Sequence, residues 1–415
     1  MAKQLDRSSK IPYVIPKTKK PKLKSNDIEV ISNVSQKYKR YQGSALFRHR
    51  IIFATLTNTS IIIDNIRSND DNPGLKDYEL SFLDLLDKIT NGSLIEINES
   101  STKIRYNPGT IIGSSYPIVF ECPTSRSISY YLEPILILLL FGKQQSIIIF
   151  NGCTYHEYDI NIDVIRGVFI PILKKHFGLM DIKIDLKRRA LPPSGGGQVK
   201  LTVPIIKELK TINLVEMGMI KRIRGLCYTV AMAPTIANRI RTECNNVLYN
   251  YISDVWIFND KTSKSELQKY VNKKYINSIS PGYGLSLIAQ TTKDVMISVS
   301  KNSIDFENDT ETNNDAPITP EKFGEYMSKM LLQEISYGGT IDTTLQGTIL
   351  TLMALGPPHV SRVIIGRLSK HSVHILRLIR DILGVTFKIK EDPQTGTIFV
   401  SCMGIGYKNI WRQAT

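Results

Sequence analysis

The spacing of hydrophobic and polar positions changes repeatedly along the chain and predicts helices alternating with strands. Apolar residues recur at helical spacing from Leu80 to Ile89, and Asn91-Gly92 supplies a helix C-terminal stop. Further predicted elements are strands at 94–97, 102–106 and 146–150, and helices at 126–141 and 161–177. The apolar run 135–141 (ILILLLF) is too short for a membrane span and predicts a buried element. This rhythm is typical of an α/β or α+β protein.

The pattern in the second half predicts a separate unit within about 221–290. A strand at 222–232 leads to Pro234 and to a helix whose apolar positions run from Ile236 to Tyr251. A strand at 254–258, a helix from 264 and the turn PGYG (281–284) follow. The acidic stretch 305–317 predicts a surface loop, and Pro320 is the expected start of a helix over 320–336.

Residues 368–384 (LSKHSVHILRLIRDILG) predict an amphipathic helix with a charged outer face. Lys370, His374, Arg377 and Asp381 share that face, and Arg380 lies at its flank. Three interpretations stay open: an ordinary solvated face, an RNA-backbone contact, or part of an RNA cleavage site that uses Arg380 and Asp381.

Length and charge narrow the function classes. A chain of 415 residues suggests two or three domains, and a net charge of +15 favours a polyanionic partner such as nucleic acid. Residues 1–40 hold eleven Lys and Arg against three acidic residues. Residues 1–36 therefore predict a disordered basic tail. A nuclear localisation signal or RNA-binding arm is expected at Lys17, Lys19, Lys20, Lys22 and Lys24. A plain solvated tail is compatible with either role.

Other sequence features argue against a zinc site, a signal peptide and a phosphate-binding loop. The five cysteines include no CxxC pair, which indicates a reduced compartment and argues against a zinc site. The N-terminus lacks the apolar core of a signal peptide, so we expect the chain to remain inside the cell, with no membrane partner. The glycine run in PSGGGQVKLTVP (193–204) is followed by strand-like alternation and lacks GK[ST]. A bend between strands is therefore expected there, and not a phosphate-binding loop.

Several unusual strings occur in one order and carry a family resemblance. They are YQGSALFRHRI (41–51), IRSNDDNPGL (66–75), SYYLEPIL (129–136), PSGGGQV (193–199), RIRGLCYTVAMAPTIANR (222–239), SPGYGLSL (280–287), LMALG (352–356) and SCMGIGYKN (401–409). Together they resemble the RNA 3′-terminal phosphate cyclase superfamily, and more narrowly its eukaryotic cyclase-like branch in ribosome biogenesis. The resemblance implies three repeated units, each a four-stranded sheet with two helices, and a small inserted α/β domain. We expect the large domain at 37–208 and 292–415 and the insert at 209–291.

The resemblance also identifies replaced positions. Cyclases adenylylate a histidine and activate an RNA 3′-phosphate, which requires a nucleophilic imidazole and cations for the phosphates. Arg48 and Arg67 match basic residues of the family motifs, but Tyr41 replaces a carboxylate and Ala45 a glutamine. Asp70 replaces a second basic residue, and Gly347-Thr348 replaces an Asp-Gln pair. We therefore expect no cyclase activity, with active cyclase the least favoured interpretation.

Some residues keep two interpretations. One register places His371 on the cyclase nucleophile, but the flanking pattern differs, and we prefer coincidence. Arg48 and Arg67 either bind an anion or form structural salt bridges. Arg222, Arg224, Arg239 and Arg241 form either an RNA or partner surface or a solvated one. His371 and His374 have metal-ligand spacing, but Lys370 and Arg377 disfavour a cation, so neither a metal nor a cofactor is expected.

The resemblance implies a function in the nucleus and nucleolus. The leading hypothesis is a non-cyclase assembly factor of the small-subunit processome, required for pre-rRNA processing. Its implied partners are pre-rRNA, a small nucleolar ribonucleoprotein, a ribosome-assembly GTPase and other processome proteins. The alternative is an endoribonuclease that cleaves pre-rRNA directly.

Overall fold

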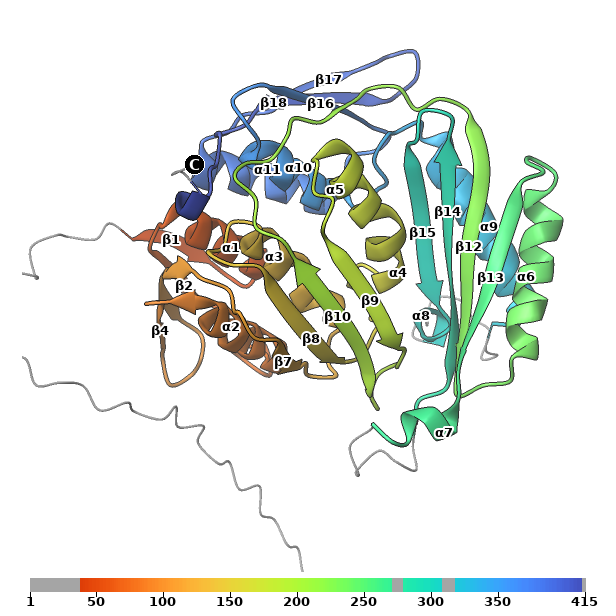
Figure 1. Cartoon of the computed structure of the whole chain (residues 1–415), viewed down its shortest axis with the longest axis horizontal. Coiled ribbons are helices and arrows are strands. Elements are labelled where there is room, and N and C mark those ends of the chain that lie inside the picture. Colours follow the sequence, from red (N-terminus) through yellow and green to blue (C-terminus); the bar gives the residue numbers. More distant parts are fainter. Residues whose placement is uncertain (1–37, 271–278, 308–317, 413–415) are drawn as a thin grey trace, which may run out of the picture. The chain divides into compact units, whose positions relative to one another are not determined.

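A computed structural model of the chain describes residues 38–270, 279–307 and 318–412. The expected basic tail, its nuclear localisation signal and most of the acidic loop lie outside the described residues. Within the described residues, the strands form four four-stranded sheets and one two-stranded ladder, with helices packed against them (Figure 1). The expected α/β class is therefore confirmed.

Three of the four-stranded sheets share one connectivity. In each, the first strand is parallel to the second, and the spatial order is first, second, fourth, third. The first unit contains β1 (Lys39–Gln42), β2 (Ile61–Asp64), β4 (Leu94–Ile97) and β5 (Ile104–Asn107), with helices α1 (Phe47–Thr57) and α2 (Asp77–Ile89). A short ladder of β3 (Thr90–Asn91) and β6 (Thr110–Ile111) follows it.

The second and third units repeat this pattern. The second contains β7 (Ile118–Glu121), β8 (Ser146–Gly152), β9 (Lys183–Arg188) and β10 (Gly197–Val203), with α3 (Ile128–Leu139), α4 (Ile162–Val164), the π-helical turn η1 (Ile165–Phe169) and α5 (Ile170–His176). The third contains β11 (Asn213–Leu214), β16 (Val360–Ile365), β17 (Lys388–Glu391) and β18 (Ile398–Met403), with α10 (Gln346–Leu355), α11 (Lys370–Leu383) and the 3-10 turn η3 (Ile410–Arg412). The repeats are thus visible in topology although the sequence shows none.

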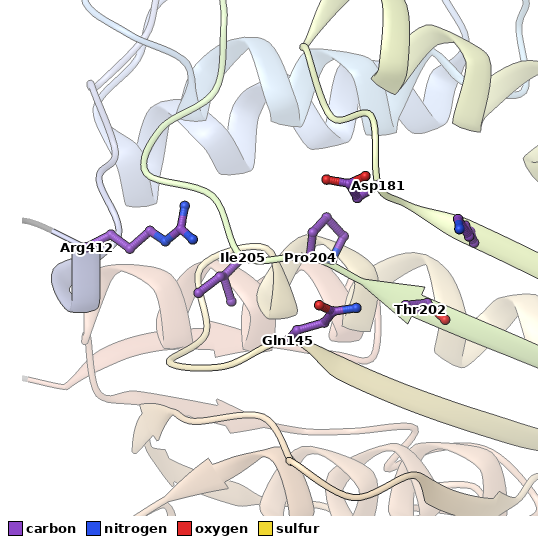
Figure 2. A pocket seen from close by; sticks show the side chains of 7 residues that line it. Gln145, Asp181, Thr202, Pro204, Ile205 and Arg412 are labelled. Atoms are coloured by element: carbon purple, nitrogen blue, oxygen red, sulfur yellow. The ribbon is translucent and has the colours of Figure 1, made fainter. Parts of the chain in front are cut away.

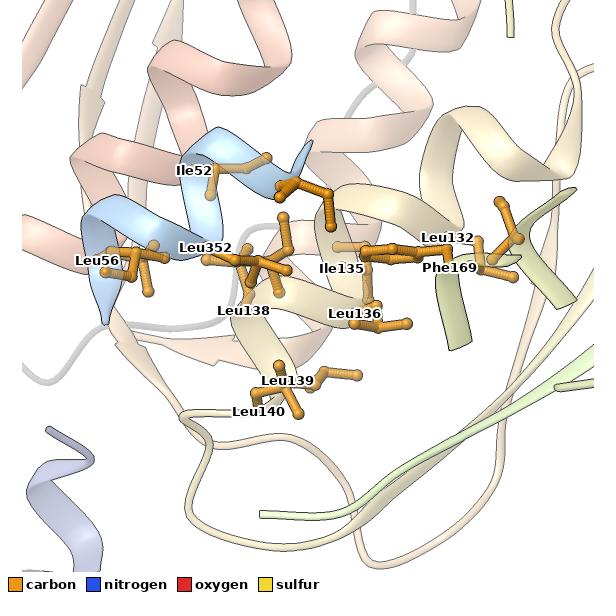
Figure 3. Close-up of a cluster of buried hydrophobic side chains, with 14 of the residues drawn as sticks. Ile52, Leu56, Leu132, Ile135, Leu136, Leu138, Leu139, Leu140, Phe169 and Leu352 are labelled. Atoms are coloured by element: carbon orange, nitrogen blue, oxygen red, sulfur yellow. The ribbon is translucent and has the colours of Figure 1, made fainter. Parts of the chain in front are cut away.

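Helices from the three units meet in one hydrophobic core. Ile52 and Leu56 of α1, Leu132 and Leu136 of α3, and Leu352 of α10 lie within it (Figure 3). The run 135–141 is buried throughout, as expected for a helix with no polar face. In α2, however, Leu80 is exposed and Phe82 and Leu85 are buried.

A fourth sheet lies between β11 and α10 in the chain and has different connectivity. Its spatial order is β13-β12-β14-β15, so its first strand is internal. The segment contains β12 (Ile220–Val230), α6 (Thr235–Leu248), β13 (Val255–Thr262), α7 (Lys264–Leu267), β14 (Gly282–Thr291), β15 (Met296–Asn302), α8 (Ile304–Glu307) and α9 (Pro320–Ser336). We call 215–339 the insert. Its sheet and α9 share a core of their own, so the expected boundary at 291 falls between two paired strands, β14 and β15.

A hydrogen bond closes the junction between the insert and the third unit, and a glycine bend shapes the second unit. Thr340 Oγ1 donates a hydrogen bond of 2.8 Å to the carbonyl of Leu214, where the chain leaves the third unit. The glycine run forms the bend between β9 and β10, because Gly195 and Gly196 have φ of 66° and 95° and Gly197 begins β10. The expected bend is therefore confirmed.

Candidate functional site

A cavity of about 190 Å³ lies where α1, the loop after β2, the start of α3 and α11 meet. Arg48 and His49 reach it from the first turn of α1, and His371 reaches it from α11. Arg67 belongs to the loop and has a left-handed backbone with φ of 44°, a strained conformation that often marks a functional loop. Arg126 and Tyr130 complete the polar wall.

Each of the three arginines in this pocket faces a carboxylate. Arg67 forms a bidentate pair with the buried Glu79, at 2.7 and 2.8 Å. Arg126 contacts both oxygens of Asp159, at 2.5 and 3.1 Å. Arg48 Nη1 lies 3.6 Å from Glu133. The arginine charges are therefore balanced one for one by carboxylates.

Burial and pairing set the ionisation of these groups. Burial raises the pKa of Asp159, but the hydrogen bonds and charge of Arg126, the charge of Arg48 and the backbone hydrogen bond from Ser127 together lower that pKa below its ordinary value. The hydrogen bond to Glu79 raises the pKa of Arg67 despite partial burial. Asp159 is thus ionised near neutral pH and offsets the positive charge of Arg126, which would otherwise attract a phosphate.

Aromatic rings hold the guanidinium groups in place. The Arg48 guanidinium lies 4.2 Å from the centre of the Tyr130 ring, and that of Arg126 lies 4.7 Å from the same centre. Arg126 also lies 5.2 Å from the Tyr78 ring centre. Arg48 Nη1 donates a hydrogen bond of 2.6 Å to the Tyr130 carbonyl. These contacts fix the orientation of both arginines before any ligand arrives.

Two imidazoles face each other in the pocket. The rings of His49 and His371 are edge to face, with centres 5.5 Å apart. Burial, and then the charge of Arg48, lower the pKa of His49 well below its ordinary value. Partial burial also lowers the pKa of His371. A Cβ at Gly347 would lie 3.7 Å from His371 Nε2, so His371 lies beside one of the replaced family positions.

Two of the other replaced positions, Tyr41 and Thr348, make side-chain contacts within the fold. The Tyr41 hydroxyl donates a hydrogen bond to Asp381, and the Thr348 hydroxyl donates one to Glu133. Burial and the neighbouring Asp381 carboxylate raise the pKa of Tyr41, so the phenol stays protonated. Asp70 is exposed in the loop that carries Arg67.

The structure separates Arg380 and Asp381 from this pocket. Arg380 follows His371 by nine residues on α11, which corresponds to about 14 Å along the helix axis. Asp381 contacts the Tyr41 hydroxyl and lies 3.7 Å from Lys39 Nζ, so its carboxylate joins α11 to β1. His374, Arg377 and Arg380 are exposed, as the amphipathic pattern predicts.

The arginines of the insert lie on two surfaces. Arg222 contacts Gln290 at 2.7 Å, and Arg224 pairs with Asp254 at 2.7 Å; both lie on β12. Arg239 lies on α6, where it pairs with Glu321 of α9 at 2.5 Å. Because α6 and α9 cover the opposite face of the sheet, Arg239 is not brought together with Arg222 and Arg224.

A larger cavity, of about 410 Å³, lies beside the end of β10 and η3 (Figure 2). Gln145, Asp181, Lys183, Thr202 and Arg412 provide its polar lining. Among the described residues that line it, none carries an imidazole or an aromatic ring, so the smaller pocket has the richer chemistry. None of these residues was predicted from the sequence.

Within the described ranges, no cluster of three or more His, Cys, Asp or Glu side chains could hold a metal. The five cysteines are buried and free, and burial raises the pKa of Cys153, Cys244 and Cys402 to about 12. No described helix is both long and apolar enough to cross a membrane.

Arg48 and Arg67 were predicted from the sequence, but their partners were missed. Tyr130 and Glu133 lie within the string SYYLEPIL (129–136), and Arg126 lies three residues before it, so this string was the available signal. Asp159 lies outside every family-like string, and only the fold brings it to Arg126.

The fold and the pocket define a class of protein with three repeated units around a pocket of paired arginines. The model of the family described as RNA 3'-terminal phosphate cyclase matches residues 39–389. The chain belongs to this family.

Particular relatives refine the class. A probable RNA 3'-terminal phosphate cyclase-like protein of Dictyostelium discoideum is 41% identical, with 90% of this chain and 99% of that protein covered. The RNA 3'-terminal phosphate cyclase-like protein of Homo sapiens is 38% identical, with 89% of this chain and 96% of that protein covered. The rRNA processing protein rcl1 of Schizosaccharomyces pombe is 36% identical, with 90% of this chain and 98% of that protein covered.

Proposed function

We propose that the chain functions in rRNA processing without cyclase activity. The name of the S. pombe relative, an rRNA processing protein, supports the pathway. In finer terms, we propose a nucleolar assembly factor of the small-subunit processome that contacts pre-rRNA and a partner GTPase. The observation that carries the proposal is the balanced charge of the arginine pocket.

The charge balance argues against nucleotidyl transfer. A cyclase must hold the phosphates of a nucleotide and of the RNA end, and each added negative charge needs a cation or a hydrogen-bond donor. Here Arg67, Arg48 and Arg126 already form ion pairs with Glu79, Glu133 and Asp159, respectively. A nucleotide would have to displace these carboxylates, which are buried or nearly so, and would leave them unpaired at a cost of several kcal/mol.

The direct test is a cyclase assay on the purified full chain. RNA that ends in a 3′-phosphate is incubated with ATP and Mg²⁺, beside an active cyclase of the family as positive control. We expect no 2′,3′-cyclic ends and no transfer of labelled AMP to protein. Cyclic ends that disappear in a His371→Ala variant would overturn the proposal.

The processing role is tested in cells. Depletion of the protein is expected to accumulate precursors of the small-subunit rRNA, and wild type and His371→Ala are expected to restore processing equally. Tagged wild type is expected to copurify with a GTPase and with pre-rRNA. Normal rRNA precursors after full depletion would contradict the proposal.

An endoribonuclease that uses Arg380 and Asp381 has less support. Metal-free cleavage needs a base, an acid and a cation around one phosphate. Asp381 is engaged with Tyr41 and Lys39, and His371 lies about 14 Å away along the helix. Specific cleavage of a pre-rRNA spacer by wild type, lost in Arg380→Ala/Asp381→Ala, would favour the nuclease.

A further inference from the structure

The two faces of the insert sheet differ most on its edge strand, β13. Val255 and Ile257 point into the core shared with α6 and α9. Trp256 and Phe258 alternate with them on the other face, where 59% and 54% of their surfaces are exposed. Their rings are nearly edge to face, with centres 5.9 Å apart. Two large aromatic side chains are therefore held side by side in solvent by a rigid strand.

The same face is covered chiefly over β14 and β15. Gly167 of η1 packs against Ile288, and Asn161 donates a hydrogen bond of 2.7 Å to Ser300. These contacts come from α4 and η1 of the second unit, which pack mainly on β14 and β15. Tyr228 of β12 is buried on this face, whereas Trp256 and Phe258 of β13 stay exposed.

Cationic side chains flank the aromatic pair. The parallel register puts Arg224 opposite Trp256 and Leu226 opposite Phe258, so all four lie on one face. Asp254 contacts both terminal nitrogens of Arg224, at 2.7 and 3.1 Å, which fixes the guanidinium plane. Lys221 and Arg222 add two further positive charges, and Arg222 is bound to a neutral partner, Gln290. Positive charge thus exceeds negative charge along this stretch of β12.

We propose that this face, the platform of Arg222, Arg224, Trp256 and Phe258, binds single-stranded RNA. Unpaired bases would stack on the rings of Trp256 and Phe258, since every base has a π face. The angle of 61° between the two rings favours two bases splayed apart, each on its own ring. Phosphates between them would lie against Lys221 and Arg222. Duplex RNA does not fit, because its bases are stacked inside the helix and not offered to a flat surface.

An RNA ligand is favoured over a protein ligand by charge. Protein interfaces also use Trp, Phe and Arg, but there the aromatic residues usually fill a pocket in a desolvated centre. Here the aromatic residues lie on an exposed strand beside β12, which carries Lys221, Arg222 and Arg224 and no acidic residue. The proposal does not rest on the function of the arginine pocket, which lies in a different part of the fold.

The test uses the full chain and a fluorescein-labelled 12-nucleotide oligouridine at fixed salt. Trp256→Leu and Phe258→Leu keep apolar strand residues but remove the π faces, and each is expected to weaken binding about tenfold, as seen by anisotropy. Trp256→Tyr is expected to retain most of the affinity. Tyr251→Ala, which removes another exposed aromatic residue of the insert, is the matched control and is expected to change nothing.

A second readout reports on the ring itself. The chain has two tryptophans, so Trp411→Phe leaves Trp256 as the one indole, and saturable quenching by oligouridine is expected. Arg222→Ala is expected to reduce the slope of log K against log salt by about 0.7. Unchanged affinity in Trp256→Leu/Phe258→Leu, with no quenching of Trp256, would overturn the proposal. Loss of a protein from purified pre-ribosomes in that variant, with RNA affinity intact, would equally overturn it and assign a protein-binding surface.

Discussion

At the residue scale, Arg189 combines several buried charge contacts in one side chain. It forms a bidentate pair with Asp163 of α4, at 2.7 and 2.8 Å, and its Nε donates to Asp260 of β13 at 2.7 Å. Its guanidinium lies 4.5 Å from the Tyr228 ring centre. One arginine that follows β9 therefore binds the insert to the second unit.

Arg189→Met is expected to destabilise the protein strongly, because it leaves the carboxylate of Asp163 buried without its cation. A loss of about 3 to 5 kcal/mol in the free energy of unfolding is expected, as measured by urea denaturation. Asp163→Asn/Arg189→Met should recover part of it. Arg239→Met, at an exposed pair, is the control and should leave the midpoint unchanged. Equal losses for the two single variants would contradict this account.

Asp342 gives the stability a specific pH dependence. Burial raises its pKa from 3.8 to about 6, although Ser298 and Leu345 donate hydrogen bonds to it. Because the folded pKa lies above the unfolded one, this contribution to stability is complete below about pH 4 and is lost as pH rises through 6. Asp342→Asn cannot lose a proton.

We therefore expect wild type to lose its advantage over Asp342→Asn between pH 4 and 6, as measured by thermal unfolding at several pH values. The comparison with Asp342→Asn is needed because the buried His49 changes stability in the opposite direction. Its lowered pKa removes stability as pH falls below about 6.5, and this contribution is the same in both proteins. Parallel curves for the two proteins across this range would contradict the assignment to Asp342.

At the element scale, the pairing of β8 with β10 depends on a glycine for a steric reason. A Cβ at Gly197 would lie 2.8 Å from the carbonyl oxygen of Gly152 and 2.8 Å from Thr154 Cγ2. A Cβ at Gly396, in contrast, would meet nothing within 4 Å, although φ there is 68°.

Gly197→Ala is expected to cost about 1 to 3 kcal/mol of unfolding free energy, because strand β10 must move away from β8. Gly396→Ala is the control for conformational strain alone and is expected to cost about 1 kcal/mol. Denaturation of both variants measures the difference. A Gly197→Ala protein as stable as wild type would show that the two strands can separate without penalty.

Local periodicity predicted the elements well where one face alone is buried. Helix α11 has the expected outer face, with His374 and Arg377 exposed, and Pro320 begins α9 as expected. Leu80 of the predicted helix is exposed, while Phe82 and Leu85 join the other predicted apolar positions on the buried side of α2. Tyr251 lies beyond the end of α6 at Leu248 and is exposed.

The pocket was less predictable because its pairs are distant in the chain. Arg126 and Asp159 are 33 residues apart, and Arg48 and Glu133 belong to different units. No periodicity within one segment carries information on such pairs. The expected end of the insert at 291 stays a prediction, and local periodicity carries no information on the pairing of β15 with β14 across this position.

At the scale of the whole molecule, positive charge is concentrated in residues 1–40. Deletion of 1–36 is expected to weaken binding of single-stranded RNA and to reduce the slope of log K against log salt by roughly 0.7 for each phosphate that is no longer neutralised. Replacement of Lys17, Lys19, Lys20, Lys22 and Lys24 by glutamine should reproduce most of both effects in the full-length chain.

The same two variants, tagged with a fluorescent protein, test the nuclear localisation signal. Both are expected to shift from the nucleus to the cytoplasm, while Arg222→Ala stays nuclear. Unchanged localisation together with an unchanged salt slope would leave the tail as a solvated segment.

The hydrogen bond between Thr340 and the carbonyl of Leu214 has a consequence for how this architecture arose. The chain leaves the third unit and returns to it at nearly the same point, and the entropy cost of closing such a loop rises only slowly with its length. An inserted domain can then be lengthened without changing the strand order of the third unit. Such a junction lets a lineage acquire, enlarge or exchange an inserted module while the three-unit scaffold is inherited intact.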